Sequence, residues 1–313
     1  MRKSLFAAGA VLSYVFLVGF FFTNKMMYIK KRSVKEIVDR ETEAGHFIQK
    51  EYDEYDKTDV TVPSPFGYNI SGYLIAPHET KKYMIICHGV TVSRVNSVKY
   101  MKIFLNRGYN VLIYDHRSHG ESGGSTTSYG HYEKYDLQAV VNWLRHYAGS
   151  GSTIGVHGES MGAVTALLYA GIVEDGADFY IADCPFADLE EQLLYRLKVE
   201  FNIPPQMVMP IAKRFLKLRD GYSMESVSPV KAVENIENPV LFIHSTEDDY
   251  IPSDATRRLH EKKVKGFKQL YFAKKGTHAM SYTENRKQYE EAVDGFLERV
   301  KEKRNRPAQP RQA

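Results

Sequence analysis

The chain has little cysteine, little excess charge and no internal repeat, and each of these shortages excludes a class of protein. Only two cysteines, Cys87 and Cys184, occur in 313 residues, so a disulfide framework is not the basis of the fold. Both lie in apolar, strand-like runs and are interpreted as free buried thiols. A formal net charge of +4 does not indicate a nucleic-acid-binding protein. The sequence shows no cluster of metal ligands, and we expect neither a metal nor an organic cofactor.

The amino terminus differs from the rest of the chain because it carries a run of about 18 uncharged residues, from Leu5 to Phe22, close to the shortest helix that spans a bilayer. A cleaved signal peptide is the alternative, but residues 20–25 offer no small-x-small cleavage site. We therefore expect a single-pass membrane anchor at residues 1–29 and a charged spacer at 30–54. Basic residues after the run favour a cytoplasmic catalytic domain. Basic residues also precede it and favour the opposite orientation, so the side of the membrane stays open.

From residue 55 to about 303 the chain has the composition and patterning of an α/β enzyme. Its 43% hydrophobic and 26% charged residues are typical of a globular domain. An antiparallel hairpin is followed by alternating strands and helices, which predicts a mostly parallel sheet with helices on both faces and a site at the carboxyl ends of the strands. We predict strands at 58–63, 68–76, 83–87, 110–114, 152–157, 179–183, 240–244 and 269–272.

Residues 186–229 interrupt this alternation. The segment contains no predicted strand and is rich in apolar residues, which are separated by Pro204, Pro205 and Pro210. We predict a small helical cap that closes over the site and shapes an apolar pocket, although a segment of this kind can also serve only as additional core. At the end of the chain, residues 304–313 are basic and contain two prolines, and a disordered tail is expected there.

The pentapeptide GESMG at 158–162 is the most informative motif. It follows a predicted strand and precedes a small, apolar segment with a helical pattern, so it occupies a sharp strand-to-helix turn. Glycines on both sides of Ser160 avoid clashes in such a turn, which exposes the serine hydroxyl. The motif alone is weak, but its strand–turn–helix context makes Ser160 the candidate nucleophile.

A serine nucleophile requires a general base, and the base requires an orienting acid. Asp248 lies just beyond the predicted strand 240–244, at the same edge of the sheet as Ser160, and is the favoured acid. His278 lies in the loop between the last strand and the last helix and is the candidate base. The order serine, acid, histidine is the one that this mechanism takes on this architecture.

The oxyanion of an acyl-transfer intermediate requires two backbone N–H donors. We expect one from Met161, at the start of the nucleophile helix, where the helix dipole is favourable. The other is expected from Val90, in the turn after the strand that ends at Cys87. His88, in the same turn, is interpreted as a structural residue that bonds loop carbonyls.

Five segments together resemble the motif set of the α/β-hydrolase superfamily. They are HGV at 88–90, DHRSHGESGG at 115–124, GESMG at 158–162, HSTEDDYIP at 244–252 and GTHAMS at 276–281. Over about residues 55–300 the chain is similar to uncharacterised membrane-anchored α/β hydrolases of bacilli, related to the carboxylesterase-like and prolyl-oligopeptidase-like branches. The resemblance implies the α/β-hydrolase fold, a triad at Ser160, Asp248 and His278, and an oxyanion donor at Val90.

Two further interpretations come with the resemblance. Asp115 and Arg117 match the D-x-R-x-x-G-x-S run, and we interpret them as a structural ion pair that braces the loop under the site rather than as substrate contacts. Asp183 ends the strand after the nucleophile helix, where a minority of these enzymes carry the acid. It is therefore the alternative partner of His278.

These residues favour a serine hydrolase that cleaves a small to medium acyl or aryl ester through an acyl-enzyme. A peptidase or amidase of the prolyl-oligopeptidase-like type is the alternative, although too few residues precede position 55 for the separate propeller domain that such enzymes usually carry. A membrane-tethered binding protein on an inactive hydrolase fold is a remote third hypothesis, because Ser160, Asp248 and His278 are all present. The expected partners are a small-molecule ester and the membrane, not nucleic acid; protein partners are not indicated.

Overall fold

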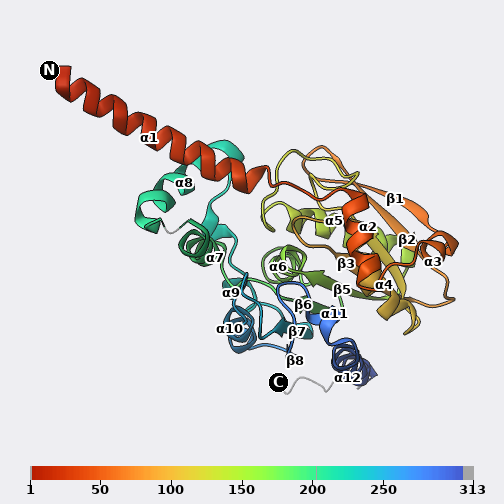
Figure 1. Cartoon of the computed structure of the whole chain (residues 1–313). Coiled ribbons are helices and arrows are strands. Elements are labelled where there is room, and N and C mark those ends of the chain that lie inside the picture. Colours follow the sequence, from red (N-terminus) through yellow and green to blue (C-terminus); the bar gives the residue numbers. More distant parts are fainter. Residues whose placement is uncertain (1, 202, 306–313) are drawn as a thin grey trace, which may run out of the picture.

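A computed structural model describes residues 2–201 and 203–305, and in this part of the chain eight strands form one sheet with the order β1-β2-β4-β3-β5-β6-β7-β8 (Figure 1). The first two strands and the β2–β4 pair are antiparallel, and all other pairs are parallel. The strands are β1 (Thr58–Pro63), β2 (Asn69–Ile75), β3 (Lys82–Cys87), β4 (Asn110–Tyr114), β5 (Thr153–Glu159), β6 (Phe179–Asp183), β7 (Val240–Ser245) and β8 (Lys268–Ala273). The predicted hairpin and mostly parallel sheet are confirmed.

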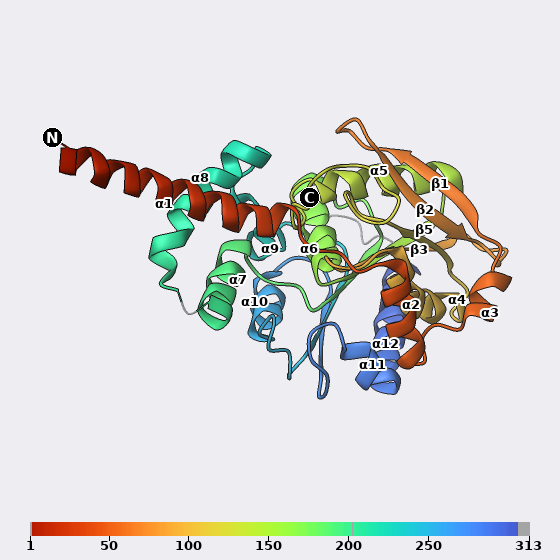
Figure 2. The same ribbon diagram turned by 45° about the horizontal axis from the view of Figure 1, so that its top comes forward.

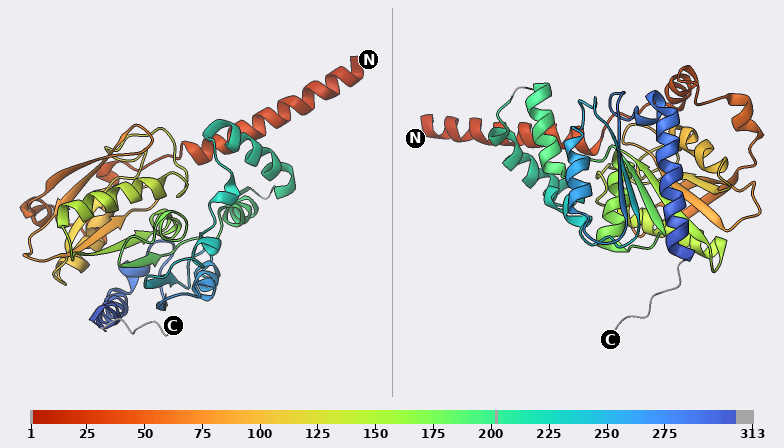
Figure 3. Two further views of the ribbon diagram at one scale, coloured as in Figure 1. Left: turned by 180° about the vertical axis from the view of Figure 1, so that it is seen from behind. Right: turned by 90° about the horizontal axis from the view of Figure 1, so that it is seen from below.

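Helices cover both faces of this sheet, as Figure 3 shows, because the strands β3 to β7 are apolar on both sides and must be covered twice. One face packs against α4 (Val98–Leu105) and α12 (Arg286–Asn305). The other packs against α5 (Glu133–Ala148), α6 (Met161–Leu168) and α10 (Asp254–Lys262). The short elements between them are η1 (Arg94–Ser97), η2 (Tyr169–Val173), α9 (Pro229–Ala232) and α11 (Ser281–Glu284).

The interruption of the alternation is helical, and the predicted cap insertion is confirmed as part of the fold. It consists of α7 (Leu189–Arg196), η3 (Leu197–Phe201), α8 (Pro205–Asp220) and η4 (Met224–Ser226). The side chain of Asp188 caps α7 by accepting the N–H groups of Glu190 and Glu191. Pro205 begins α8 at a position where a missing N–H costs nothing. Apolar residues of these elements form a separate cluster with the end of the first helix and with α6.

The first helix, α1 (Arg2–Met27), extends away from the domain with α8 beside it, in the views of Figures 1 and 2. Its segment Phe6–Met27 is long and apolar enough to cross a membrane, with a mean hydropathy of 2.0. A signal sequence has the same length and composition, so the anchor stays a prediction.

The predicted spacer is not a free linker. Residues 34–54 contain α2 (Val34–Glu43) and α3 (Gln49–Glu54). Just before α2 the Arg32 N–H donates to the Thr91 carbonyl at 2.9 Å, and near the end of α2 Arg40 donates to Asn96 Oδ1. Ile37 and Phe47 are buried, and Phe47 belongs to the same apolar cluster as α4 and α12. The sequence predicts a charged, weakly helical spacer here, and two buried side chains among many charged residues do not reveal that the segment packs on the domain.

The prediction of a disordered tail at 304–313 concerns mostly residues that lie outside the described part of the chain. The first two of them, Arg304 and Asn305, are the last residues of α12, so helix extends into the segment that we expected to be disordered.

Candidate active site

Ser160 sits in a sharp turn between β5 and α6 that only small neighbours permit. Its φ angle is +54°, a left-handed conformation that a non-glycine residue rarely adopts and that recurs at functional sites. The Ser160 N–H donates to the Asp183 carbonyl at 2.8 Å, which ties the turn to the neighbouring strand. A Cβ at Gly162 would lie 2.1 Å from the Cys87 carbonyl oxygen, and one at Gly158 would meet the backbone of α6 at 2.4 Å. The two glycines therefore allow the turn to pack against the end of β3.

Ser160, His278 and Asp248 form a chain of hydrogen bonds at the carboxyl edge of the sheet. The Ser160 Oγ lies 2.8 Å from His278 Nε2. On the other side of the ring, His278 Nδ1 lies 2.7 Å from Asp248 Oδ2. The three residues come from loops after β5, β8 and β7, and both distances are within the range in which a proton is shared or transferred. The arrangement has the connectivity of a nucleophile, its base and the acid that orients the base.

The carboxylate of Asp248 is held in an ionised state by its surroundings. Burial alone would raise its pKa, but hydrogen bonds from His244 and His278 and from the Ile251 N–H lower the pKa well below its usual range. The Oδ1 atom accepts the backbone N–H groups of Tyr250 and Ile251, both at 2.9 Å. Because the Asp248 carboxylate is charged and held in place, it sets the tautomer of His278 and stabilises the cationic form of that ring.

Asp183, the alternative acid, lies deeper and faces different groups. Its side chain is buried, and its Oδ2 accepts the hydroxyl of Tyr100 at 3.3 Å. Burial, with the nearby Glu159 carboxylate, raises its pKa to about 6. Among the described residues, His278 Nδ1 donates its hydrogen bond to Asp248, and no hydrogen bond joins His278 to Asp183. The geometry therefore favours Asp248 as the partner of the histidine.

The two expected oxyanion donors belong to segments that border Ser160. Met161 is the first residue of α6, and Val90 lies in the turn after β3. A Cβ at Gly89, the residue before Val90, would lie 3.7 Å from Ser160 Cβ, so this turn borders the nucleophile. His119 Nε2 contacts the Val90 carbonyl oxygen at 2.5 Å, which fixes the orientation of the peptide groups in the turn. That Met161 and Val90 donate to an oxyanion stays a prediction.

The expected ion pair between Asp115 and Arg117 is wrong. Asp115 instead pairs with Arg94, whose NH1 lies 2.8 Å from Asp115 Oδ2 and whose backbone N–H donates to Oδ1 at 2.7 Å. The guanidinium of Arg117 lies over the ring of Tyr132, 4.4 Å from its centre. The backbone explains the difference, because Ser118 has a φ of +60° and the chain turns sharply just after Arg117. Arg94, from the loop after β3, fills the space beside the carboxylate.

We expect Arg94→Met to destabilise the fold far more than Arg117→Met. Removing Arg94 leaves Asp115, which is 1% exposed, as a buried carboxylate without its partner, a change that typically costs about 3–5 kcal/mol. The Arg117 guanidinium instead lies over the rings of Tyr132 and Tyr68, and a cation–π contact of this kind is worth roughly 0.5–2 kcal/mol. Urea unfolding of both variants measures the two losses. Equal losses would contradict this account of the loop.

Sequence reasoning missed a second group of buried charges directly behind the nucleophile. Glu159, the residue before Ser160, pairs with Lys99 at 2.6 Å, and both side chains are less than 5% exposed. Tyr100 and Asn96 also donate to Glu159, at 2.7 and 3.0 Å. Burial opposes ionisation of Glu159, but the Lys99 ammonium lowers its pKa to about 2. No spacing rule links Lys99, on α4, with Glu159 at the end of β5, so no sequence signal was available.

His244 was also missed, although a signal existed. It ends the buried strand β7, four residues before Asp248, and its Nε2 lies 3.0 Å from Asp248 Oδ2. Its Nδ1 lies 2.6 Å from the hydroxyl of Thr256. A histidine at the polar end of an apolar strand, next to a candidate acid, indicates a residue that positions this acid.

One group at the site has the composition of a metal centre. Ligand atoms of Cys184, Asp248 and His278 lie within 4.8 Å of one another. Burial raises the pKa of the Cys184 thiol well above its usual value, which disfavours the thiolate that metals require. The facing atoms of Asp248 and His278 already bond to each other. These residues therefore fit a metal poorly.

A family model for the α/β hydrolase fold matches residues 82–222, and the chain belongs to the α/β-hydrolase superfamily, as the motifs suggested. The uncharacterised protein YqkD of Bacillus subtilis is 54% identical over 301 residues, which cover 96% of this chain and 98% of that protein. The lysophosphatidylserine lipase ABHD12 of Rattus norvegicus is 24% identical over 217 residues, 64% of this chain. The chain spans about half of that lipase, 51% of its length.

Solved structures show the same architecture. The esterase Pf2001 of Pyrococcus furiosus superposes with a TM-score of 0.67 at 25% identity, over 81% of this chain and 95% of that one. An acylaminoacyl peptidase of Pyrococcus horikoshii superposes with a TM-score of 0.60 at 19% identity, over 80% of this chain and 43% of that one. The peptidase shows the fold alone, whereas the family and the similarity to the esterase support hydrolase activity for the chain.

Proposed function

We propose that the protein is a serine hydrolase that cleaves carboxylic esters through an acyl-enzyme. The observation that carries the proposal is the unbroken chain from Ser160 Oγ through His278 to Asp248, with distances of 2.8 and 2.7 Å. A carboxylate and a histidine from the loops after two different strands meet at a serine with a left-handed backbone, which is the arrangement that nucleophilic catalysis requires. The similarity to an esterase and to a lipase supports an ester as the substrate.

In the first half of the reaction, the Ser160 oxygen attacks the ester carbonyl carbon while its proton moves to His278 Nε2. Asp248 stabilises the imidazolium that forms. The negative oxygen of the tetrahedral intermediate accepts hydrogen bonds from the backbone N–H groups of Met161 and Val90. When this intermediate collapses, the bond to the alcohol breaks and His278 returns the proton to the departing alkoxide. The acyl group remains on Ser160.

In the second half, a water molecule takes the place of the alcohol. His278 removes a proton from this water, the hydroxide attacks the acyl carbonyl, and the same N–H groups stabilise the second oxyanion. Collapse of the second intermediate releases the carboxylic acid and returns the proton to Ser160. Each step uses only residues of this chain and water.

The preference for esters over amides is tested by direct competition of substrates on the full chain in detergent. p-Nitrophenyl acetate and butyrate are compared with aminoacyl p-nitroanilides by the release of nitrophenol or nitroaniline. We expect the esters to have the higher kcat/KM, because the alcohol leaves without the strong protonation that an amine requires. Faster turnover of the anilides would overturn the ester assignment and favour a peptidase, and turnover of neither would argue against the catalytic proposal.

A further inference from the structure

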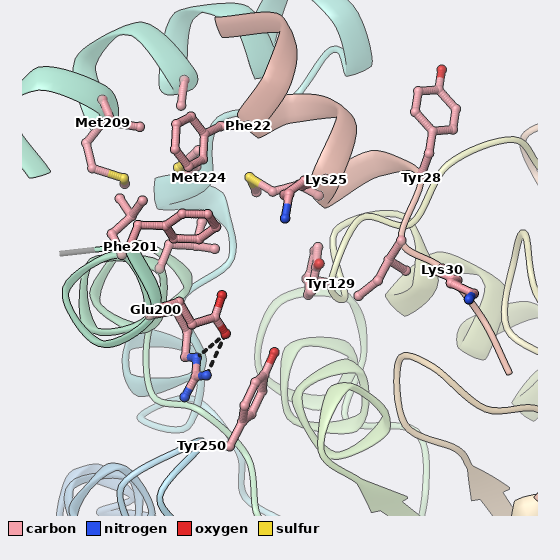
Figure 4. Close-up of a pocket in the computed structure, with 17 residues that line it drawn as sticks. Phe22, Lys25, Tyr28, Lys30, Tyr129, Glu200, Phe201, Met209, Met224 and Tyr250 are labelled. Carbon is pink, nitrogen blue, oxygen red and sulfur yellow. Dashed lines mark hydrogen bonds and ion pairs between the residues drawn. The ribbon is translucent and has the colours of Figure 1, made fainter. Parts of the chain in front are cut away.

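A cavity of about 490 Å³ lies between the end of α1 and the cap (Figure 4). Its volume is within the range of small-molecule sites, roughly 300–1,000 Å³. Most of the wall is apolar, and the two sides come from different parts of the chain. Phe22 and Met26 of α1 face Leu193, Phe201, Met209 and Met224 of the cap.

The inner end of this cavity borders the candidate active site. Tyr250 lines the cavity, and its ring lies 5.0 Å from the ring of His278. Arg196 lies over the ring of the same tyrosine, 4.2 Å from its centre, and is paired with Glu200. Figure 4 shows Tyr250 and Glu200 at one end of the cavity and the apolar residues of α1 and the cap at the other. A group attached to Ser160 therefore has an apolar space within reach beyond Tyr250.

The outer wall belongs to the helix that we expect in the membrane, and this helix is fixed to the cap. Gly19 packs so tightly against Phe215 of α8 that a Cβ would lie 2.4 Å from its ring. Arg219 of α8 donates to Thr23 and Asn24 of α1 at 2.5 and 2.6 Å. The last turns of α1 and the cap therefore form one structural unit.

Apolar side chains on the outside of this unit extend the surface of α1. On α8, Leu218 is 82% exposed and Met207 is 52% exposed, and on α1 Leu17 is 66% exposed. Exposed apolar residues on neighbouring helices indicate contact with a membrane or a partner. Since α1 has the length and hydropathy of a spanning helix, lipid is the occupant that fits this surface, and the cap then rests at the bilayer.

We propose that the cavity binds a single acyl chain of an ester lipid that enters from the bilayer, and that α1 is a wall of the substrate site as well as an anchor. This inference rests on the proposed ester hydrolysis and names its substrate class. The ester carbonyl lies at Ser160, and the acyl chain runs past Tyr250 between Met26 and the cap. The site is incomplete without the helix, so chain-length selectivity depends on residues of α1.

The test is a chain-length series of p-nitrophenyl esters from acetate to laurate, hydrolysed by the full chain in detergent. For the wild type, kcat/KM should rise with each methylene that enters the cavity, by at most about fourfold per methylene. Met26→Trp in α1 and Leu193→Trp in the cap fill the cavity. They should lower kcat/KM for laurate at least tenfold and leave acetate within twofold. Leu12→Trp, at an exposed position of α1, and Leu218→Trp, at an exposed position of α8 in the cap, are the controls and should match the wild type.

Phe22→Ala supplies an independent variant, because it enlarges the cavity and should move the optimum to longer chains. If a tryptophan variant misfolds and also loses acetate hydrolysis, Phe22→Ala still tests whether the cavity binds the acyl chain. The acyl-chain site would be overturned if Phe22→Ala kept the wild-type optimal chain length. It would also be overturned if the tryptophan variants had the same ratio of kcat/KM for laurate to kcat/KM for acetate as the wild type. A wild type that hydrolyses acetate with a flat profile overturns only this inference, whereas a wild type that hydrolyses none of the esters overturns the proposed function.

Discussion

His278→Ala is expected to lower kcat for p-nitrophenyl acetate by about 10⁶-fold. The ring is the only group in the described part of the chain that bonds the Ser160 hydroxyl, through Nε2 at 2.8 Å. Without it the serine must lose its proton to water, and removal of the base in a serine triad has an effect on the order of 10⁶. The residual rate would come from the oxyanion donors and from substrate binding.

The matched control for this variant is His146→Ala, which removes an exposed histidine from α5 and should leave kcat unchanged. Thermal unfolding of both variants checks that the fold is retained. A His278→Ala enzyme that keeps more than about one hundredth of the wild-type rate would contradict the role of His278 as the base, because a positioned general base contributes roughly 10²–10⁴ even on its own.

The second large effect separates the two candidate acids. Asp248→Asn should lower kcat by about 10⁴-fold, because the amide neither fixes the tautomer of His278 nor stabilises its cation. Asp183→Asn should change kcat less than tenfold, since Asp183 bonds Tyr100 rather than the histidine. Steady-state hydrolysis of p-nitrophenyl acetate by the two variants measures both effects. The reverse order would show that Asp183 is the acid.

Asp183→Asn has a further effect, on stability. Because the pKa of Asp183 is raised to about 6, the folded chain keeps its proton between about pH 4 and 6, whereas the unfolded chain releases it. Stability from this group is therefore lost as the pH rises through this window, by about 3 kcal/mol in all. The Asn variant should lack this loss, which urea unfolding at pH 4.5 and 7 measures. A wild type with no greater loss than the variant would contradict the raised pKa.

The sheet was predictable because β3 to β7 are short apolar runs with clear breaks on both sides, while β1 and β2 alternate between apolar and polar residues. All eight strands occur where the patterning placed them, including the hairpin of β1 and β2. This topology alone predicted that the site forms at the edge of the sheet where the carboxyl ends of the parallel strands lie. Proximity of Ser160, Asp248 and His278 was therefore expected from their places after β5, β7 and β8, and the distances agree with it. Their catalytic roles stay predictions.

Contacts between side chains from distant loops were not predictable. Arg94 displaced Arg117 as the partner of Asp115 because the chain turns at Ser118, and a backbone angle at a serine leaves no mark in the sequence. The Lys99–Glu159 pair joins two elements whose packing is known only once the sheet is assembled. The contact of α1 with the cap is of the same kind, since neither helix alone indicates that it has a partner. Sequence reasoning detects patterns among residues that are close together in the chain, whereas these contacts join residues that are far apart in it.

The central claim is that Ser160 is an activated nucleophile, and covalent labelling tests it most directly. The purified full chain is treated with a fluorophosphonate, digested, and analysed by peptide mass spectrometry, with Ser160→Ala and the exposed-site variant Ser150→Ala treated in parallel. The account predicts an adduct on Ser160 in the wild type and in Ser150→Ala, and no adduct in Ser160→Ala. No adduct in the wild type, or labelling that survives Ser160→Ala, would contradict it.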